Sequence, residues 1–344
     1  MALNDTQFAH VLGRIRSMES QMLNENEIER MLGASNVKEA FKILNETSYS
    51  NHVLDITNVD DFQKVIDAEL LETATMLKKL SPAAEYLNVL WYIYDIHNIK
   101  TLLKGKLDKV WEGEINELLN SLGSLDLEKL KAYFRTEEAH FPDTVFEEHK
   151  VHFVEAIRKI EADYAKNEDY QMIDLMFDKL YFELTLEIAQ NSGDAFLIEF
   201  MVRNVDLFNI GALFRLKFKN AEAAEIKKVF ASGGKLELGD MERLAEKNTS
   251  EIPALLKETH YKQIGQAILE EFETQGSMIK IDEMSQNNLT DFVKLAKSIT
   301  YGIAPVLAFF WAKNNNAQII RMILLAKIAG IKPEAVKSHI RKLY

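Results

Sequence analysis

One helical pattern occurs twice in this sequence, and the distance between its copies limits the folds that the chain can adopt. The copies are YDIHNIKTLLKGK at residues 94–106 and VDLFNIGALFRLK at residues 205–217. Each contains an Asp and an Asn three residues apart, then Ile, then an apolar run that ends in basic residues. The paired residues are Asp95 with Asn98, and Asp206 with Asn209. This shared pattern predicts two copies of one structural unit.

A weaker third copy extends the repeat. NNNAQIIRMILLAK at residues 314–327 has Asn315 and Gln318 at the equivalent places. Asp95, Asp206 and Asn315 follow one another at nearly equal spacings of about 110 residues, whereas the repeats of common solenoids reach about 50 residues at most. The copies therefore belong to larger bodies. We expect three helical units of similar size, at residues 1–125, 126–225 and 226–344.

A second pair of segments supports the same period. Residues 28–50, IERMLGASNVKEAFKILNETSYS, resemble residues 241–262, MERLAEKNTSEIPALLKETHYK. Their offset is almost constant from the start of the segments to the matched Tyr49 and Tyr261, and it is close to twice the first spacing. Three similar helical bodies can close around a pseudo-threefold axis, which places equivalent surfaces around a central hollow. The sequence predicts such an arrangement.

The fold class follows from apolar periodicity. Apolar residues recur at helical spacing, and no alternating strand pattern persists for five residues. With only 14 Gly and 5 Pro, and abundant Leu, Lys, Glu and Ala, the composition favours helix throughout. We predict an all-α protein, with Asp194 as a helix cap and Pro82 at a helix start. The helices are expected at residues 6–23, 25–33, 37–45, 59–80, 83–105, 113–121, 126–135, 143–166, 169–191, 194–217, 222–231, 239–247, 251–257, 261–274, 289–313, 315–329 and 333–342.

The repeated Asp and Asn side chains call for partners inside the protein. Spaced three residues apart, they lie on one surface of a helix, within its apolar stripe. Both types are poor helix-interior residues, because they compete for backbone hydrogen bonds, and buried polar groups are normally hydrogen-bonded. An acid–base role would imply two or three equivalent active sites in one chain. We interpret the pairs as structural ties: Asp95, Asn98, Asp206 and Asn209.

Residues for catalysis or metal binding are sparse. The chain has no cysteine, which excludes disulfides and thiolate ligands, and it has no GxSxG or phosphate-loop motif. EEHKVH at residues 147–152 places His149 and His152 near Glu148, but not in the HExxH arrangement that binds zinc. A solvated helix face is the preferred interpretation of this segment. We expect no catalytic residue, no cofactor and no metal.

Charge is distributed unevenly. The net charge of −12 argues against a nucleic-acid partner, because phosphate neutralisation needs a basic surface. Basic residues gather at residues 100–109, 211–219 and 321–342, each after one copy of the repeated helix. We expect at least one of these places to face an acidic partner surface. The candidate contact residues are Lys104, Lys106, Arg215, Lys217, Arg321 and Lys327.

The sequence also predicts a location. The opening segment, MALNDTQFAHVLGRIRSMES, lacks an apolar signal core. No run approaches the roughly 18 uncharged apolar residues that cross a bilayer. We expect a cytoplasmic protein without a membrane span.

Four segments in order carry a resemblance to one family. WYIYDIHNIKTLLKGKL resembles the signature of the central-stalk subunit of V-type and archaeal-type (A-type) rotary ATPases, known as the C subunit in prokaryotes and the d subunit in eukaryotes. VLGRIRSMESQML is similar to the opening helix of that family. GDAFLIEFMVRNVDLFNIGALFRLK and NNNAQIIRMILLAKIAGIKPEAVKSHIRKLY resemble its second and third segments. One departure is that Asn314, Asn315 and Asn316 are neutral where the family usually has acidic residues.

The resemblance implies a fold and a function. It implies a funnel of three helical domains, without catalytic activity, on the cytoplasmic side of the membrane. The implied partners are rotor shaft subunits of the D and F type and the membrane proteolipid c-ring, which the funnel couples for ion transport or ATP synthesis. The alternative is a cytoplasmic α-helical scaffold that binds protein partners outside a rotary machine.

Overall fold

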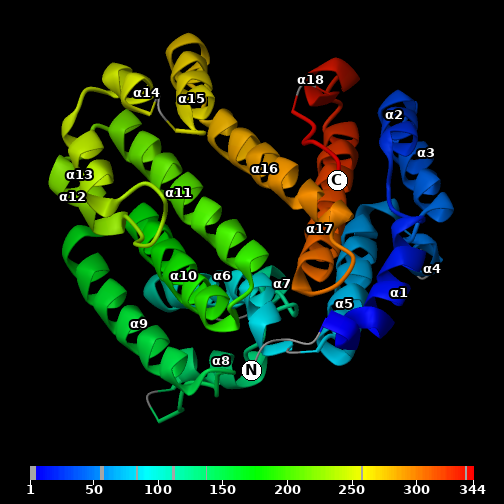
Figure 1. Ribbon diagram of the computed structural model, residues 1–344, viewed down its shortest axis with the longest axis horizontal. Helices are drawn as coiled ribbons and strands as arrows, with labels where there is room; N and C mark the ends of the chain where they lie inside the picture. Colours follow the sequence, from blue (N-terminus) through cyan, green and yellow to red (C-terminus); the bar gives the residue numbers. More distant parts are fainter. Residues whose placement is uncertain are drawn as a thin grey trace. The chain divides into compact units, whose positions relative to one another are not determined.

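The computed structural model describes residues 5–54, 58–82, 84–110, 113–136, 138–256, 259–337 and 339–344. Throughout these ranges the regular elements are α-helices and short 3-10 helices, with no strand (Figure 1). The prediction of an all-α fold is confirmed. Within the same ranges, no helix combines the length and the apolar character needed to cross a membrane.

The chain forms two compact units, of which the first is discontinuous in sequence. Met1–Ala84 and Gln286–Tyr344 make up the first unit, and Glu85–Ser285 make up the second. These boundaries follow contacts, whereas the boundaries at 125–126 and 225–226 follow repetition in the sequence. The division into three repeats and their closure around an axis therefore stay predictions.

The first unit is built around one long buried helix, α17 (Ile303–Ile328). The helix carries its own apolar side chains on every side, which is typical of a helix in the centre of a core. Helices α1, α3 and α5 pack against it. The other helices of the unit are α1 (Ala9–Glu19), α2 (Glu25–Gly33), α3 (Val37–Lys42), α4 (Ser50–Val53), α5 (Phe62–Leu80) and α18 (Pro333–Lys337).

In the second unit, α10 (Tyr170–Ser192) packs against α6 (Asn88–Asp108), α9 (Glu147–Asn167) and α11 (Ala195–Phe218) (Figure 1). The Asp194 carboxylate accepts a hydrogen bond from the Leu197 N–H at 2.8 Å and caps α11, as predicted. The remaining helices are α7 (Glu114–Leu118), α8 (Leu127–Arg135), α12 (Ala223–Val229), α13 (Leu238–Glu246), α14 (Ile252–Leu255) and α15 (Lys262–Gln275); α16 (Ile279–Val293) crosses the boundary between the units.

Several predicted helix boundaries are wrong, most clearly near the C-terminus, where α16 begins at Ile279 and not at residue 289. The sequence predicted a helix at 289–313 and a second at 315–329, but α17 runs without a break from Ile303 to Ile328. The break lies earlier, at Gly302, whose φ of 92° is in the left-handed region that favours glycine. Asn315 and Asn316 are buried inside α17, so packing outweighs their low helix propensity. The helix expected at 333–342 ends at Lys337, and Ser338 lies outside the described residues.

Candidate functional site

Asp95 of α6 holds the loop that precedes α8. The Asp95 side chain is fully buried. Its carboxylate accepts hydrogen bonds from the backbone N–H groups of Ser124 and Leu125 at 2.9 and 3.0 Å. It also accepts one from the Ser124 hydroxyl at 2.6 Å. Three donors therefore offset much of the desolvation of this buried charge.

Asn98, one turn further along α6, binds the same loop at a second point. Its Nδ2 donates to the carbonyl of Asn120 at 2.8 Å, and its Oδ1 accepts from the N–H of Asn120 at 2.8 Å. The side-chain amide of Asn98 thus pairs with both the N–H and the carbonyl of one residue, as two backbone segments do in a sheet. We call the group formed by Asp95, Asn98 and loop residues 120–125 the Asp95 clamp.

The second copy of the pattern forms the same arrangement in α11. Asn209 exchanges two hydrogen bonds with Ala231, donating to its carbonyl at 2.9 Å and accepting from its N–H at 2.8 Å. Asp206 accepts from the N–H groups of Lys235 and Leu236 at 3.2 and 2.9 Å. The hydroxyl of Tyr261 donates to Asp206 at 2.9 Å. We call Asp206, Asn209 and loop residues 231–236 the Asp206 clamp.

The two clamps share one sequence spacing throughout. Each Asn binds the residue 22 positions later, and each Asp binds the residues 29 and 30 positions later. Each clamped loop leads into a nine-residue helix, α8 or α13. A Cβ atom at Gly123 or Gly234 would lie 2.3 or 2.1 Å from the clamping carboxylate, so both loops need glycine there. The sequence repeat thus corresponds to a repeat of hydrogen bonds.

The third copy departs from this arrangement. Asn315 of α17 donates to the carbonyl of Lys342 at 2.7 Å, and its buried Oδ1 has no hydrogen-bond partner among the described residues. Asn316 donates to the carbonyl of Leu23 at 3.4 Å. With neutral side chains at these places, α17 does not form a carboxylate clamp on the part of the chain that the structure describes.

A buried ion pair lies close by on α17 instead. The ammonium of Lys313 contacts the carboxylate of Glu69 in α5 and donates to the hydroxyl of Ser48 at 2.7 Å. Both charged side chains are almost fully buried. Sequence reasoning missed this pair, because Lys313 and Glu69 are 244 residues apart and neither has a local signal.

Burial changes the acidity of the Asp206 clamp. It raises the pKa of Asp206, although the N–H donors and the Tyr261 hydroxyl act in the opposite direction. The pKa of Tyr261 is also raised, by burial first and then by the neighbouring Asp206 charge. The Tyr261 hydroxyl therefore stays protonated and serves as a hydrogen-bond donor.

Most of the basic residues proposed as partner contacts have internal partners. Lys104 and Lys106 of α6 form ion pairs, both at 2.7 Å, with Asp174 of α10 and Glu161 of α9. The remaining partners are Asp282 for Arg215 at 2.6 Å, Asp67 for Arg321 at 2.7 Å, and the carbonyls of Leu32 and Ala34 for Lys327 at 2.6 and 2.5 Å. At these five places an internal group already compensates part of the charge.

Lys217 is the exception among the six. Its ammonium has no hydrogen-bond or ion-pair partner among the described residues, and partial burial lowers its pKa. It is therefore the candidate contact whose charge the protein itself leaves uncompensated.

The prediction of a solvated face for the EEHKVH segment is wrong for His149, although it agrees with the exposure of His152. His149 is buried, and its Nδ1 lies 3.0 Å from the hydroxyl of Tyr92. Burial lowers the pKa of His149, so its neutral form is favoured. His152 is exposed. The prediction is wrong for His149 because the apolar residues of α9, such as Phe153, turn its side of the helix into the core.

One group of potential metal ligands lies in the first unit. Within the described ranges, the ligand atoms of His52, Glu69 and Glu72 lie within 4.8 Å of one another. His52 Nε2 is 3.1 Å from Glu72 and 3.5 Å from Glu69. Because the Lys313 ammonium already occupies Glu69, we interpret the group as a charge network and not as a metal centre.

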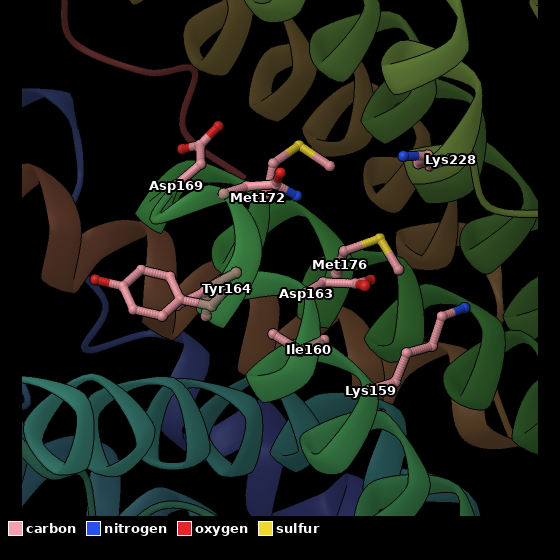
Figure 2. Close-up of a pocket in the computed structure, with 10 residues that line it drawn as sticks. Lys159, Ile160, Asp163, Tyr164, Asp169, Met172, Met176 and Lys228 are labelled. Atoms are coloured by element: carbon pink, nitrogen blue, oxygen red, sulfur yellow. The ribbon is translucent and has the colours of Figure 1, made fainter.

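A cavity of about 360 Å³ opens between α9 and α10. Met172 and Met176 of α10 line it together with Ile160 and Tyr164 of α9 (Figure 2). Charged groups around it are two lysines and two aspartates: Lys159, Lys228, Asp163 and Asp169. Among these described lining residues, no hydroxyl or amine nucleophile is hydrogen-bonded to a base.

Comparison with known proteins defines the family. The family model of the ATP synthase (C/AC39) subunit matches residues 11–339. The C subunit of the A-type ATP synthase of Methanocaldococcus jannaschii is 23% identical, over 98% of this chain and 87% of that protein. The C subunit of the V-type sodium ATPase of Enterococcus hirae is 22% identical, over 96% of this chain and 97% of that protein. The chain belongs to the ATP synthase (C/AC39) subunit family, which confirms the resemblance seen in the sequence.

Proposed function

We propose that this chain is a non-catalytic central-stalk subunit of a rotary ATPase, which couples the rotor shaft to the proteolipid c-ring. The family match over residues 11–339 supports membership of such a complex. The relatives are named as subunits of A-type ATP synthases and of a V-type sodium ATPase. The proposed partners are the D-type and F-type shaft subunits and the c-ring, on the cytoplasmic face of the membrane.

The observation that carries the mechanical part of the proposal is the pair of clamps. Torque passes between shaft and ring only if the coupling part deforms little, and close-packed interiors transmit strain. Asp95 and Asp206 each fix a loop to a long helix through several charge-assisted hydrogen bonds. The proposed role of these ties is to stiffen the helical bodies, which we expect to be three in number around a central hollow.

We propose a non-catalytic role because of the chemistry of the described residues. They include no nucleophile–base pair in the cavity between α9 and α10, and the acidic group around Glu69 is compensated by Lys313. We expect the isolated chain to bind neither ATP–Mg nor zinc tightly. One-to-one binding of either ligand in isothermal titration calorimetry would contradict this part of the proposal.

The decisive experiment is purification of the tagged chain from native membranes, followed by mass spectrometric identification of its partners. We expect shaft subunits and proteolipid. Recovery of soluble partners alone would favour the scaffold alternative.

The contact residues are tested in assembly with purified rotor subunits. Lys217→Gln should slow association more than Lys104→Gln, because Lys104 is held by Asp174. The salt series runs from about 50 to about 500 mM, over which the screening length falls roughly threefold. If both variants and the wild type share one association rate and one salt slope, these residues are solvated helix ends only.

A further inference from the structure

A second cavity, of about 570 Å³, lies between α8, the loop that follows it, and α9. Its aromatic lining comes from Phe134 and Phe141, which are buried, and from Tyr133. The Tyr133 ring meets the other two edge-on, with centroids 5.3 and 5.2 Å away. The aromatic cluster is therefore packed and preformed, and not a set of mobile surface side chains.

The charged residues around this cavity are mainly basic, in a chain whose net charge is −12. Among the described residues that line it, Lys106, Lys150 and Arg158 lie with one carboxylate, that of Glu161. Lys106 pairs with Glu161 at 2.7 Å, and Lys150 pairs at 2.8 Å with Asp143, whose side chain is 86% exposed. Both pairs are open to solvent and hold little energy, so an incoming carboxylate can exchange with them.

Arg158 differs from the two lysines. It is exposed on α9 and has no ion-pair or hydrogen-bond partner among the described residues. Burial raises the pKa of Tyr133, while the charges of Arg158 and Lys106 lower it, which agrees with both cations lying near the phenol. A planar guanidinium beside an aromatic surface is suited to binding a carboxylate in two-point fashion.

We propose that this cavity binds an acidic segment of a partner protein, with an aromatic or large apolar side chain placed against Tyr133, Phe134 and Phe141. Aromatic anchors in preformed pockets dominate protein interfaces, and complementary charge guides the approach. The cavity between α9 and α10 is a poorer match, because its two lysines are balanced by two aspartates. The inference rests on the proposed function only for the source of the segment, which is another subunit of the same complex.

The test uses the purified full chain and a fluorescein-labelled peptide of about 12 residues, which spans roughly 40 Å when extended. The peptide is rich in Glu and Asp and has one central Trp. Fluorescence anisotropy should show saturable binding that weakens with salt. Arg158→Gln and Lys150→Gln should each weaken binding about threefold, in line with exposed ion pairs. Replacing Trp by Ala in the peptide should weaken it about tenfold.

A matched control comes from the next residue along α9. Lys159→Gln makes the same change of charge but lines the cavity between α9 and α10, and should leave peptide affinity within about twofold. If Lys159→Gln and Arg158→Gln weaken binding equally, the attraction is diffuse and the cavity site is disproved. Equal competition by inorganic phosphate or by a single-stranded oligonucleotide would show a general anion site and overturn the peptide assignment.

Failure here is separable from failure of the proposed function. The peptide experiment needs no other subunit, so absence of binding would disprove the cavity site alone. Loss of co-purification with shaft and proteolipid, combined with intact peptide binding, would instead leave the site and remove the rotary source of its ligand.

Discussion

Two long helices, α11 in the second unit and α17 in the first, each bury a charged side chain but compensate its charge in different ways. In α11, the Asp206 carboxylate receives neutral donors, two backbone N–H groups and the Tyr261 hydroxyl. In α17, the Lys313 ammonium meets an opposite charge on Glu69 and the hydroxyl of Ser48. The charge on α11 is thus stabilised by neutral hydrogen-bond donors, and the charge on α17 by an opposite charge.

The two kinds of compensation serve different connections. The Asp206 clamp joins its helix to a loop 29 and 30 residues later, within one continuous stretch of chain. Lys313 bonds to residues that are 244 and 265 positions away, and so ties the two sequence segments of the discontinuous first unit. We infer that loss of the Asp206 carboxylate loosens a loop, whereas loss of the Lys313 ammonium weakens a whole unit.

The largest effect is expected at Lys313. Lys313→Met removes the ammonium, keeps similar volume and leaves Glu69 buried without its counter-charge, which should cost about 3–5 kcal/mol in free energy of unfolding. Adding Glu69→Gln should recover most of this loss, because no lone charge is left buried. Urea unfolding followed by circular dichroism measures both.

The control for Lys313 is Lys64→Met, since Lys64 forms an exposed pair with Asp61 and should change stability by less than about 1 kcal/mol. A Lys313→Met protein as stable as this control would remove the contrast between the two helices, because it would show that the buried pair carries no net stabilisation.

The next effect is expected at the clamps. Asp206→Ala and Asp95→Ala each leave buried N–H donors without an acceptor, which should cost about 1–3 kcal/mol. Thermal melts of the isolated protein would show the loss as a lower melting temperature. An unchanged melting temperature together with failed assembly would mean that the Asp–Asn pairs are interface elements and not internal ties.

A smaller effect is expected in the pH dependence of the Asp206 clamp. Because the pKa of Asp206 is raised in the folded state, the folded protein binds the proton more tightly than the unfolded chain does. Asp206 therefore stabilises the fold at pH values below its ordinary pKa of about 4, and this contribution is lost as pH rises through the raised folded value. The free energy of unfolding of wild type, measured relative to Asp206→Asn, should fall as pH rises from the ordinary pKa to the raised one. Above the raised pKa, this difference should stay constant.

Urea unfolding of wild type and Asp206→Asn at a series of pH values provides the measurement. If wild type instead gains stability relative to Asp206→Asn as pH rises, the pKa of Asp206 is lowered in the folded state. The hydrogen-bond donors would then outweigh burial. That result would mean that the Asp206 charge is compensated as fully as the Lys313 charge, and the contrast between the two helices would shrink.

The smallest effect is expected at the partly exposed pair of Lys104 and Asp174. Lys104→Gln should cost at most about 1 kcal/mol, because solvent and salt screen the pair and two long side chains lose freedom in it. A double-mutant cycle with Asp174→Asn isolates the interaction. A coupling energy above about 2 kcal/mol would place this pair with the buried one and erase the distinction between exposed and buried charges.

Local sequence patterns were enough to predict the helical fold, the repeated Asp–Asn motif and the burial of its side chains. Helical periodicity is a local property, and an Asp inside an apolar stripe requires a partner whatever the partner is. The equal spacing of the two clamps was also present in the sequence, because Asp95 and Asp206 have the same separation as Gly123 and Gly234. The hydrogen-bond partners of these Asp and Asn side chains could not be predicted from the sequence.

Tertiary packing alone settled which charges meet. The basic residues of α6 looked available to an external partner, yet the packing of α6 against α10 brings Lys104 to Asp174, 70 residues away. Packing also buried His149, kept α17 continuous through three asparagines and paired Lys313 with Glu69. These outcomes escape the sequence because apolar burial, which is roughly proportional to area and non-directional, sets the path of the helices. Polar partners are then fixed by distances of a few ångströms, which no sequence spacing specifies.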